Sequence, residues 1–115
     1  MTLYHADVYL PANLKLPSGA MLLEYSPHAV HESKVDRYGR VDLPSYIRFA
    51  DYKVIEVEVV GGVVTKVLYR GQLDSTRDLC LVIIPKTRTV KTCWVNLRVD
   101  LHTTLDISKY ARRAA

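Results

Sequence analysis

Apolar and polar residues alternate through much of the second half of the chain, and this pattern predicts an antiparallel β-sheet. Between residues 53 and 60, Ile55, Val57 and Val59 alternate with Glu56 and Glu58. Because successive side chains of a strand point to opposite faces, this segment is predicted to be a strand with one apolar and one polar face.

Three further strands are predicted after it. The pair Gly61-Gly62 indicates a two-residue hairpin turn, since such turns require positive φ. The return strand covers residues 63–70, where Thr65 lies on the same face as Val63, Val67 and Tyr69. Residues 78–85 are apolar on both faces, which is typical of a central strand, and residues 88–97 form the last strand. Its single tryptophan, Trp94, is expected in the core.

A helix is predicted before the sheet, over residues 27–38. Ser26 can cap it, Pro27 suits its first position, and Gly39 suits the position after its end. The helix is weakly amphipathic. One stripe at three- and four-residue spacing contains His28, His31, Val35 and Tyr38.

The remaining segments are shorter. Residues 4–10 are predicted to be an edge strand, 11–19 a loop with two prolines, and 20–25 a strand leading into the helix. Asp106 can cap a final helical turn through Tyr110. We therefore predict one α+β domain over residues 1–115, with a helix packed on a roughly four-stranded antiparallel meander. Residues 1–24 are its N-terminal extension or edge strand.

The composition is that of a globular protein, and the cytoplasm is the expected compartment. Of the 115 residues, 49% are hydrophobic and 24% charged, which argues against disorder. No signal peptide is visible at the start, and the longest apolar run is too short for a membrane span. The net charge of +4 is a mild basic excess that permits an anionic partner such as RNA without requiring one.

The two cysteines are not spaced as zinc ligands. If Lys86 and Thr87 form a two-residue loop, Cys80 and Cys93 lie opposite each other on neighbouring strands, and a cross-strand disulfide is geometrically conceivable. In a reducing cytoplasm we expect two buried thiols instead.

Several short motifs accompany the order of helix and meander. They are Ser26-Pro27-His28-Ala29 and Asp36-Arg37-Tyr38-Gly39 at the helix ends, Asp78-Leu79-Cys80-Leu81-Val82-Ile83 and Val90-Lys91-Thr92-Cys93-Trp94-Val95-Asn96 in the last strands, and Asp100-Leu101-His102-Thr103-Thr104-Leu105-Asp106 with Tyr110 after them. Over residues 25–110 this arrangement resembles the barnase–EndoU–colicin RNase–RelE superfamily, and within it small phage-encoded and RelE-, ParE- or BrnT-like proteins. The resemblance implies a RelE-like fold and a metal-independent endoribonuclease, acting as a toxin or phage effector on RNA.

Metal-independent RNA cleavage needs a base for the 2′-OH proton, an acid for the leaving oxygen, and cations for the phosphate charge. Histidine suits proton transfer near neutral pH. In the resembling fold, the helix face and the last strands can converge on a basic, concave surface. The predicted catalytic residues are His28, His31, Arg37, Lys91, Thr92 and His102, and the predicted substrate-binding residues are Asn96 and Tyr110.

Each of these residues also has a structural explanation. The helical histidines can pack or order the first turn, Lys91 can be a solvated edge lysine, and Arg37 can pair with a carboxylate or the helix C-terminus. A metal site using His28 and His31 with Asp100 or His102 is the less favoured chemistry, so no cofactor is expected.

Two other functions remain open. Because some ParE-like relatives do not cleave RNA, the same scaffold can be a non-catalytic phage or host interaction protein that binds and inhibits a host protein. An RNA-binding domain without cleavage is disfavoured, since Glu56 and Glu58 make part of the sheet a poor surface for RNA. The partners considered are therefore RNA, a host protein or a cognate antitoxin, with no membrane and with the oligomeric state open.

Overall fold

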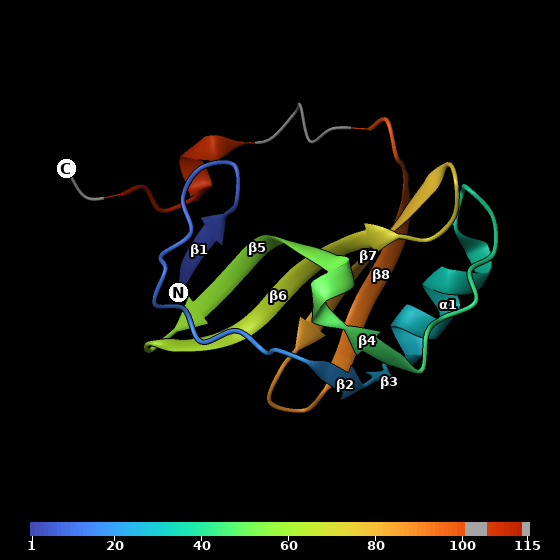
Figure 1. Cartoon of the computed structure of the whole chain (residues 1–115), viewed down its shortest axis with the longest axis horizontal. Coiled ribbons are helices and arrows are strands. Elements are labelled where there is room, and N and C mark those ends of the chain that lie inside the picture. The colour runs from blue at the N-terminus through green and yellow to red at the C-terminus, as the bar shows by residue number, and fades with distance from the viewer. Residues whose placement is uncertain (101–105, 114–115) are drawn as a thin grey trace.

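The computed structural model describes residues 1–100 and 106–113, and Figure 1 shows the arrangement of their helices and strands. The elements in chain order are β1 (Thr2–His5), β2 (Ala20–Leu22), β3 (Glu24–Tyr25), α1 (Pro27–Val35), β4 (Tyr46–Arg48), the 3₁₀ turn η1 (Phe49–Asp51), β5 (Tyr52–Val60), β6 (Val63–Gln72), β7 (Arg77–Ile84), β8 (Thr89–Leu97) and the 3₁₀ turn η2 (Ile107–Lys109). The predicted α+β class is confirmed, with one α-helix in the described part of the chain.

The sheet is larger than the four-stranded meander predicted. In the described residues it has six strands in the order β1-β5-β6-β7-β8-β3. The four predicted strands form its centre and are antiparallel. The edge strand β1 lies within residues 2–5 rather than 4–10 and pairs with β5, while β3 adds two residues parallel to β8. Segments this short carry too few residues to show a periodic pattern.

The Gly61-Gly62 turn forms as predicted. Val60 pairs with Val63 across it, and the two glycines have φ of +57° and +78°. Residues with side chains rarely adopt two successive positive φ values, so the hairpin depends on this pair.

The loop between β7 and β8 differs from the prediction. Strand pairing ends at Ile84 and Thr89, so four residues rather than two make the connection, and Arg88 within it has φ of +58°. The pairs Ile84–Thr89 and Ile83–Val90 are those that a two-residue loop would also give, but a bulge at Lys91 shifts the register beyond them. Because of this bulge, Cys93 lies opposite Leu81, and Cys80 lies opposite Trp94. The two cysteines face opposite sides of the sheet, which excludes a cross-strand disulfide.

Both cysteines are instead free, buried thiols, as expected. Burial raises the pKa of Cys80 to about 12 and that of Cys93 to about 11. Each thiol therefore stays protonated at neutral pH.

The helix ends earlier than predicted, at Val35 rather than Tyr38. Asp36 leaves the helical conformation, with φ of −60° and ψ of 137°, and its Oδ1 accepts a hydrogen bond from the Tyr38 backbone N–H at 2.9 Å. Gly39 has the expected positive φ, but its N–H bonds the Asp36 carbonyl in the turn after the helix. The buried positions of α1 are Ala29 and Ser33, not the predicted histidine stripe.

Both ends of α1 are bonded to the outer edge of β8. At the N-terminus, Ser26 caps the helix by accepting from the Ala29 N–H at 3.0 Å and donates its hydroxyl to the Lys91 carbonyl at 2.7 Å. At the C-terminus, Asp36 Oδ2 accepts from the Val95 N–H at 2.9 Å. The two ends of the helix thereby bond backbone groups of β8 beyond the two residues that pair with β3.

One face of the sheet carries the main core. Its central side chains include Val57, Tyr69, Leu81 and Val95, and they pack against Ala29 of α1, Ile47 of β4 and Phe49 of η1. Figure 1 shows α1 and the short strands β2 and β4 at the β8 end of the sheet, with η2 beside β1 at the other end. In the described ranges, no helix has the length and apolar character needed to cross a bilayer.

Tyr69 gives a direct test of this core. Its side chain is 1% exposed, and its hydroxyl has no hydrogen-bond partner among the described residues. We expect Tyr69→Phe to stabilise the fold by about 1 kcal/mol, because a buried unpaired hydroxyl is removed without changing the ring. Urea denaturation measures the difference.

Tyr25→Phe is the matched control. The Tyr25 hydroxyl donates to the Pro44 carbonyl, so its loss is expected to lower the free energy of unfolding. A destabilised Tyr69→Phe variant would contradict this account of the core.

Candidate functional site

The second face of the sheet, here called the open face, is covered by no described helix. Register across β5, β6, β7 and β8 decides which side chains lie on it. The members used below are Glu56, Glu58, Lys66, Leu68, Arg70, Asp78, Cys80, Val82, Thr92, Trp94 and Asn96. Helix α1 lies on the opposite face, since the Cys93 thiol donates to the Ala29 carbonyl at 3.3 Å.

The centre of the open face is apolar. Leu68 pairs with Val82, and Trp94 lies diagonally next to Val82 because Val82 pairs with Thr92. All three apolar side chains are half-buried, and none belongs to the core or packs against it within the described residues. We call Leu68, Val82 and Trp94 the apolar strip. The prediction of Trp94 as a core residue was wrong, because the bulge at Lys91 reverses the faces of the β8 residues that follow it.

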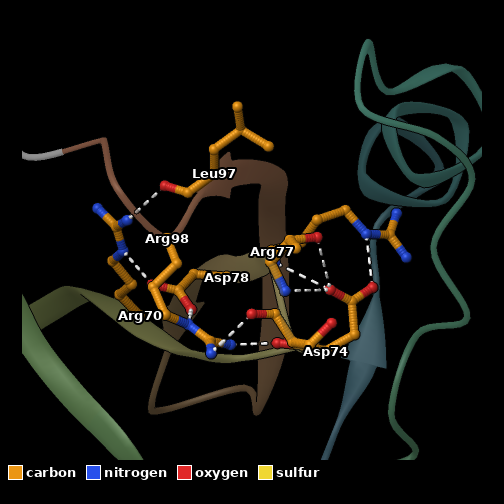
Figure 2. A network of polar contacts seen from close by, with 8 residues as sticks. Arg70, Asp74, Arg77, Asp78, Leu97 and Arg98 are labelled. Atoms are coloured by element: carbon orange, nitrogen blue, oxygen red, sulfur yellow. Dashed lines mark hydrogen bonds and ion pairs between the residues drawn. The ribbon is translucent and has the colours of Figure 1, made fainter.

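One end of the apolar strip is bordered by an ionic network, shown in Figure 2. Asp78 accepts from Arg70 Nε at 2.9 Å through Oδ2 and from Arg98 Nε at 3.4 Å through Oδ1. Arg70 also donates to the Leu97 carbonyl at 3.1 Å. The side chains of Arg70 and Asp78 are only 11% and 15% exposed, so this pair is largely desolvated.

The network continues into the β6–β7 turn. Arg77 Nε donates to Asp74 Oδ2 at 2.7 Å, and Arg77 Nη1 donates to the Tyr38 carbonyl at 3.1 Å. Hydrogen bonds from the Thr76 backbone, then the Arg77 side chain, lower the pKa of Asp74 to about 2. These contacts hold the turn to the loop that follows α1, so the arginines here are committed to structure.

A hollow of about 800 Å³ adjoins this network. Tyr52, Lys53 and Ile55 line one part of it, and Arg70 and Asp78 line another. Its acidic and basic side chains are balanced, which gives no preference for an anion or a cation.

At the other end of the open face, Glu58 is held ionised by three neighbours. Thr65 Oγ1 donates to Glu58 Oε1 at 2.8 Å, and Lys66 Nζ lies 3.4 Å from Oε2. The Thr65 hydrogen bond lowers the pKa of Glu58, and the charges of Lys66 and Lys91 act in the same direction. Lys91 itself is the exposed bulge residue of β8, between Val90 of the core and Thr92 of the open face.

Glu56 is the next acidic residue along β5, and it binds Tyr110. The Tyr110 hydroxyl donates to Glu56 Oε1 at 2.6 Å, and its ring lies 4.9 Å from the buried His5 ring. Burial, and then the bond to Glu56, raise the pKa of Tyr110 above its usual value. Tyr110 is thus an anchor for the segment after η2 rather than a solvent-facing group.

Three β-bulges shape the open face. The ladders skip Ile55, Thr65 and Lys91, which have no partner in the register. Strict alternation predicts Thr65 with the core valines, but the bulge turns its hydroxyl to Glu58. Alternation already places Glu58 and Arg70 on this face, and only the contact of Thr65 with Glu58 depends on a bulge, which leaves little local signal in the sequence.

The predicted helical residues lie on the other side of the molecule. His28 and His31 are both exposed, and His28 Nε2 lies 3.4 Å from Glu32 Oε1 on the outer surface of α1. Arg37 is exposed, with its guanidinium 4.7 Å from the Tyr38 ring centre. The expected convergence of helix and last strand is wrong, because α1 contacts the sheet through Ala29 and Ser33 on the core side.

The predicted strand residues, in contrast, share the open face. Thr92 pairs with Val82, Asn96 donates to Cys80 Sγ at 3.7 Å, and Tyr110 donates to Glu56. Lys91 is exposed and is skipped by the register. His102 lies outside the described residues. Among those that are described, no group of three or more His, Cys, Asp or Glu side chains is arranged to hold a metal ion.

Comparison with known proteins adds no family assignment. No protein-family model, no curated protein and no solved structure matches the chain. The resemblance to the RelE superfamily therefore stays a prediction.

The largely buried ion pair of Arg70 and Asp78 can be tested for its contribution to stability. Asp78→Asn is expected to cost about 2 kcal/mol in the free energy of unfolding, because it leaves the guanidinium of Arg70 without its anionic partner. Chemical denaturation measures the loss.

Asp51→Asn is the control, since the Arg48–Asp51 pair is 65% and 61% exposed and is expected to contribute nothing measurable. Equal effects of the two substitutions would contradict the structural role of the Arg70–Asp78 pair.

Proposed function

We propose that this chain is a non-catalytic protein-binding domain that docks an amphipathic helix of a partner on its open face. The observation that carries the proposal is the double-sided apolar character of β7. Its core-facing residues are buried, yet Val82 on the other face is apolar as well and has no covering layer in the described residues. A strand apolar on both faces is typical of a sheet covered on both sides.

The composition of the open face supports this proposal. Protein interfaces have an apolar centre with a polar rim, and tryptophan and arginine are enriched in them. Here the apolar strip is bordered by the Arg70–Asp78 network at one end and by Glu56 and Glu58 at the other. The arginines and carboxylates already have partners within the chain, so the rim needs little rearrangement on binding.

The chemistry of the partner follows from the same layout. Helices cover sheets in two-layer and three-layer domains, and a partner helix would supply the layer that this face lacks. Its apolar stripe would lie along the strip, with basic residues toward Glu56 and Glu58 and acidic residues toward Lys91. The scaffold supporting this function is proposed to be RelE-like, since the helix precedes an antiparallel meander of four long strands.

The test is a substitution in the apolar strip. Trp94→Ala is expected to weaken partner binding by about 2 kcal/mol, because half-buried tryptophans at interface centres carry much of the affinity. Binding is measured by affinity capture from host extract followed by titration of the purified partner, and hydrogen exchange of the complex maps the contact.

A double substitution elsewhere serves as the control. Leu22 and Tyr46 are an exposed cross-strand pair on β2 and β4, so Leu22→Ala with Tyr46→Ala removes apolar surface away from the strip. Equal loss in both variants, or exchange protection outside β6, β7 and β8, would contradict docking on the open face.

A metal-independent endoribonuclease is the second candidate, favoured by the ionised Glu58 between lysines. A carboxylate can accept the 2′-OH proton, and Lys66 and Lys91 can offset phosphate charge. In this candidate function the catalytic residues lie on the open face and not among the histidines of α1.

RNA incubated with the protein in EDTA tests this candidate. Glu58→Gln is expected to lower the cleavage rate by about 100-fold, while His31→Ala leaves it unchanged. Intact RNA after incubation with the wild-type chain would count against cleavage and leave binding as the function.

A further inference from the structure

The segment that contains η2 and the residues directly after it reaches the outer edge of β1. The Ala111 N–H donates to the Leu3 carbonyl at 2.8 Å, while the inner edge of β1 pairs with β5. Figure 1 shows η2 beside β1 at this end of the sheet. A backbone bond to an open strand edge is the contact by which extended peptides add to a sheet. We call residues 106–111 the clasp.

One side chain anchors the clasp. Tyr110 is 7% exposed, its hydroxyl donates to Glu56, and its ring contacts His5. The preceding residues 106–109 are all exposed, and Ile107 is 51% exposed. The segment is therefore attached by an anchor and a strand-edge bond, with little other buried surface.

The charges of the clasp segment and of the site that it occupies are complementary. The acidic side is Glu56 with Glu58 nearby on the same strand. Within the clasp, Asp106 and Lys109 offset each other, and Arg112 and Arg113 directly after it make residues 106–113 basic. Lys109 lies over the Tyr110 ring. The hydroxyl matters as well, since phenylalanine in this position would leave the Glu56 carboxylate without the bond.

We propose that Leu3, His5 and Glu56 form a binding site for an extended, tyrosine-bearing basic peptide of a partner protein, and that the clasp occupies this site as an internal ligand. A partner segment would bond the β1 edge, place its tyrosine on His5 against Glu56, and displace residues 106–111. This site lies at the β1 end of the open face, because Leu3 and His5 pair with Glu58 and Glu56. It does not use the apolar strip as a binding surface and does not rest on the function proposed above.

A labelled peptide with the sequence of residues 106–113 tests the proposal by fluorescence anisotropy against the full chain. In the wild type the clasp competes at an effective concentration on the order of millimolar, so binding is expected to be weak. Tyr110→Ala releases the clasp and is expected to bind the peptide about tenfold more tightly or better. Equal affinities of the two proteins would overturn the proposal.

Two further measurements identify the anchor. A peptide with phenylalanine in place of tyrosine is expected to bind Tyr110→Ala about tenfold more weakly, because it cannot donate to Glu56. Equal binding of the two peptides would overturn the role of the hydroxyl. Tyr110→Phe in the chain keeps the ring and provides the same comparison if Tyr110→Ala does not fold.

A third variant distinguishes the peptide site from the apolar strip. Trp94→Ala combined with Tyr110→Ala is expected to bind the peptide as tightly as Tyr110→Ala alone. Loss of peptide binding in this double variant would show that the peptide contacts the apolar strip, and would contradict a separate site at the β1 edge.

Discussion

The attachment of α1 to the outer edge of β8 is the constraint on which the rest of the structure depends. Ser26 and Asp36, at the two ends of one helix, both bond backbone groups of the last strand. Because both ends are fixed, the helix packs on one face of the sheet and at one position along β8. The covered face then becomes the core, and the open face is left for function.

This constraint explains which parts of the motifs are structural. Ser26 and Asp36 stand in the two short motifs that suggested a family resemblance, and their side chains are fully used in holding the helix. The histidines between them project from the opposite surface of α1. A motif at a helix end is therefore explained here by capping and edge bonding, without a catalytic role for its neighbours.

The regular elements could be predicted from the sequence because they follow periodic rules. The Gly61-Gly62 turn, the four long strands and the caps Ser26 and Asp106 all depend on residues close in the chain. The rest depends on contacts between distant residues. The helix ends early because Asp36 bonds Val95, 59 positions away, and Trp94 faces outward because a bulge at Lys91 changes the register.

The two buried thiols lie on opposite faces of the same sheet, with Cys93 under α1 and Cys80 between Trp94 and Arg70. Because only a thiolate reacts quickly, neither sulfur is available to an alkylating reagent while its surroundings stay closed. The labelling rate of each cysteine therefore measures how fast a different part of the structure moves. Modification of Cys93 reports detachment of the helix, and modification of Cys80 reports movement of the side chains around it on the open face, Arg70 and Trp94.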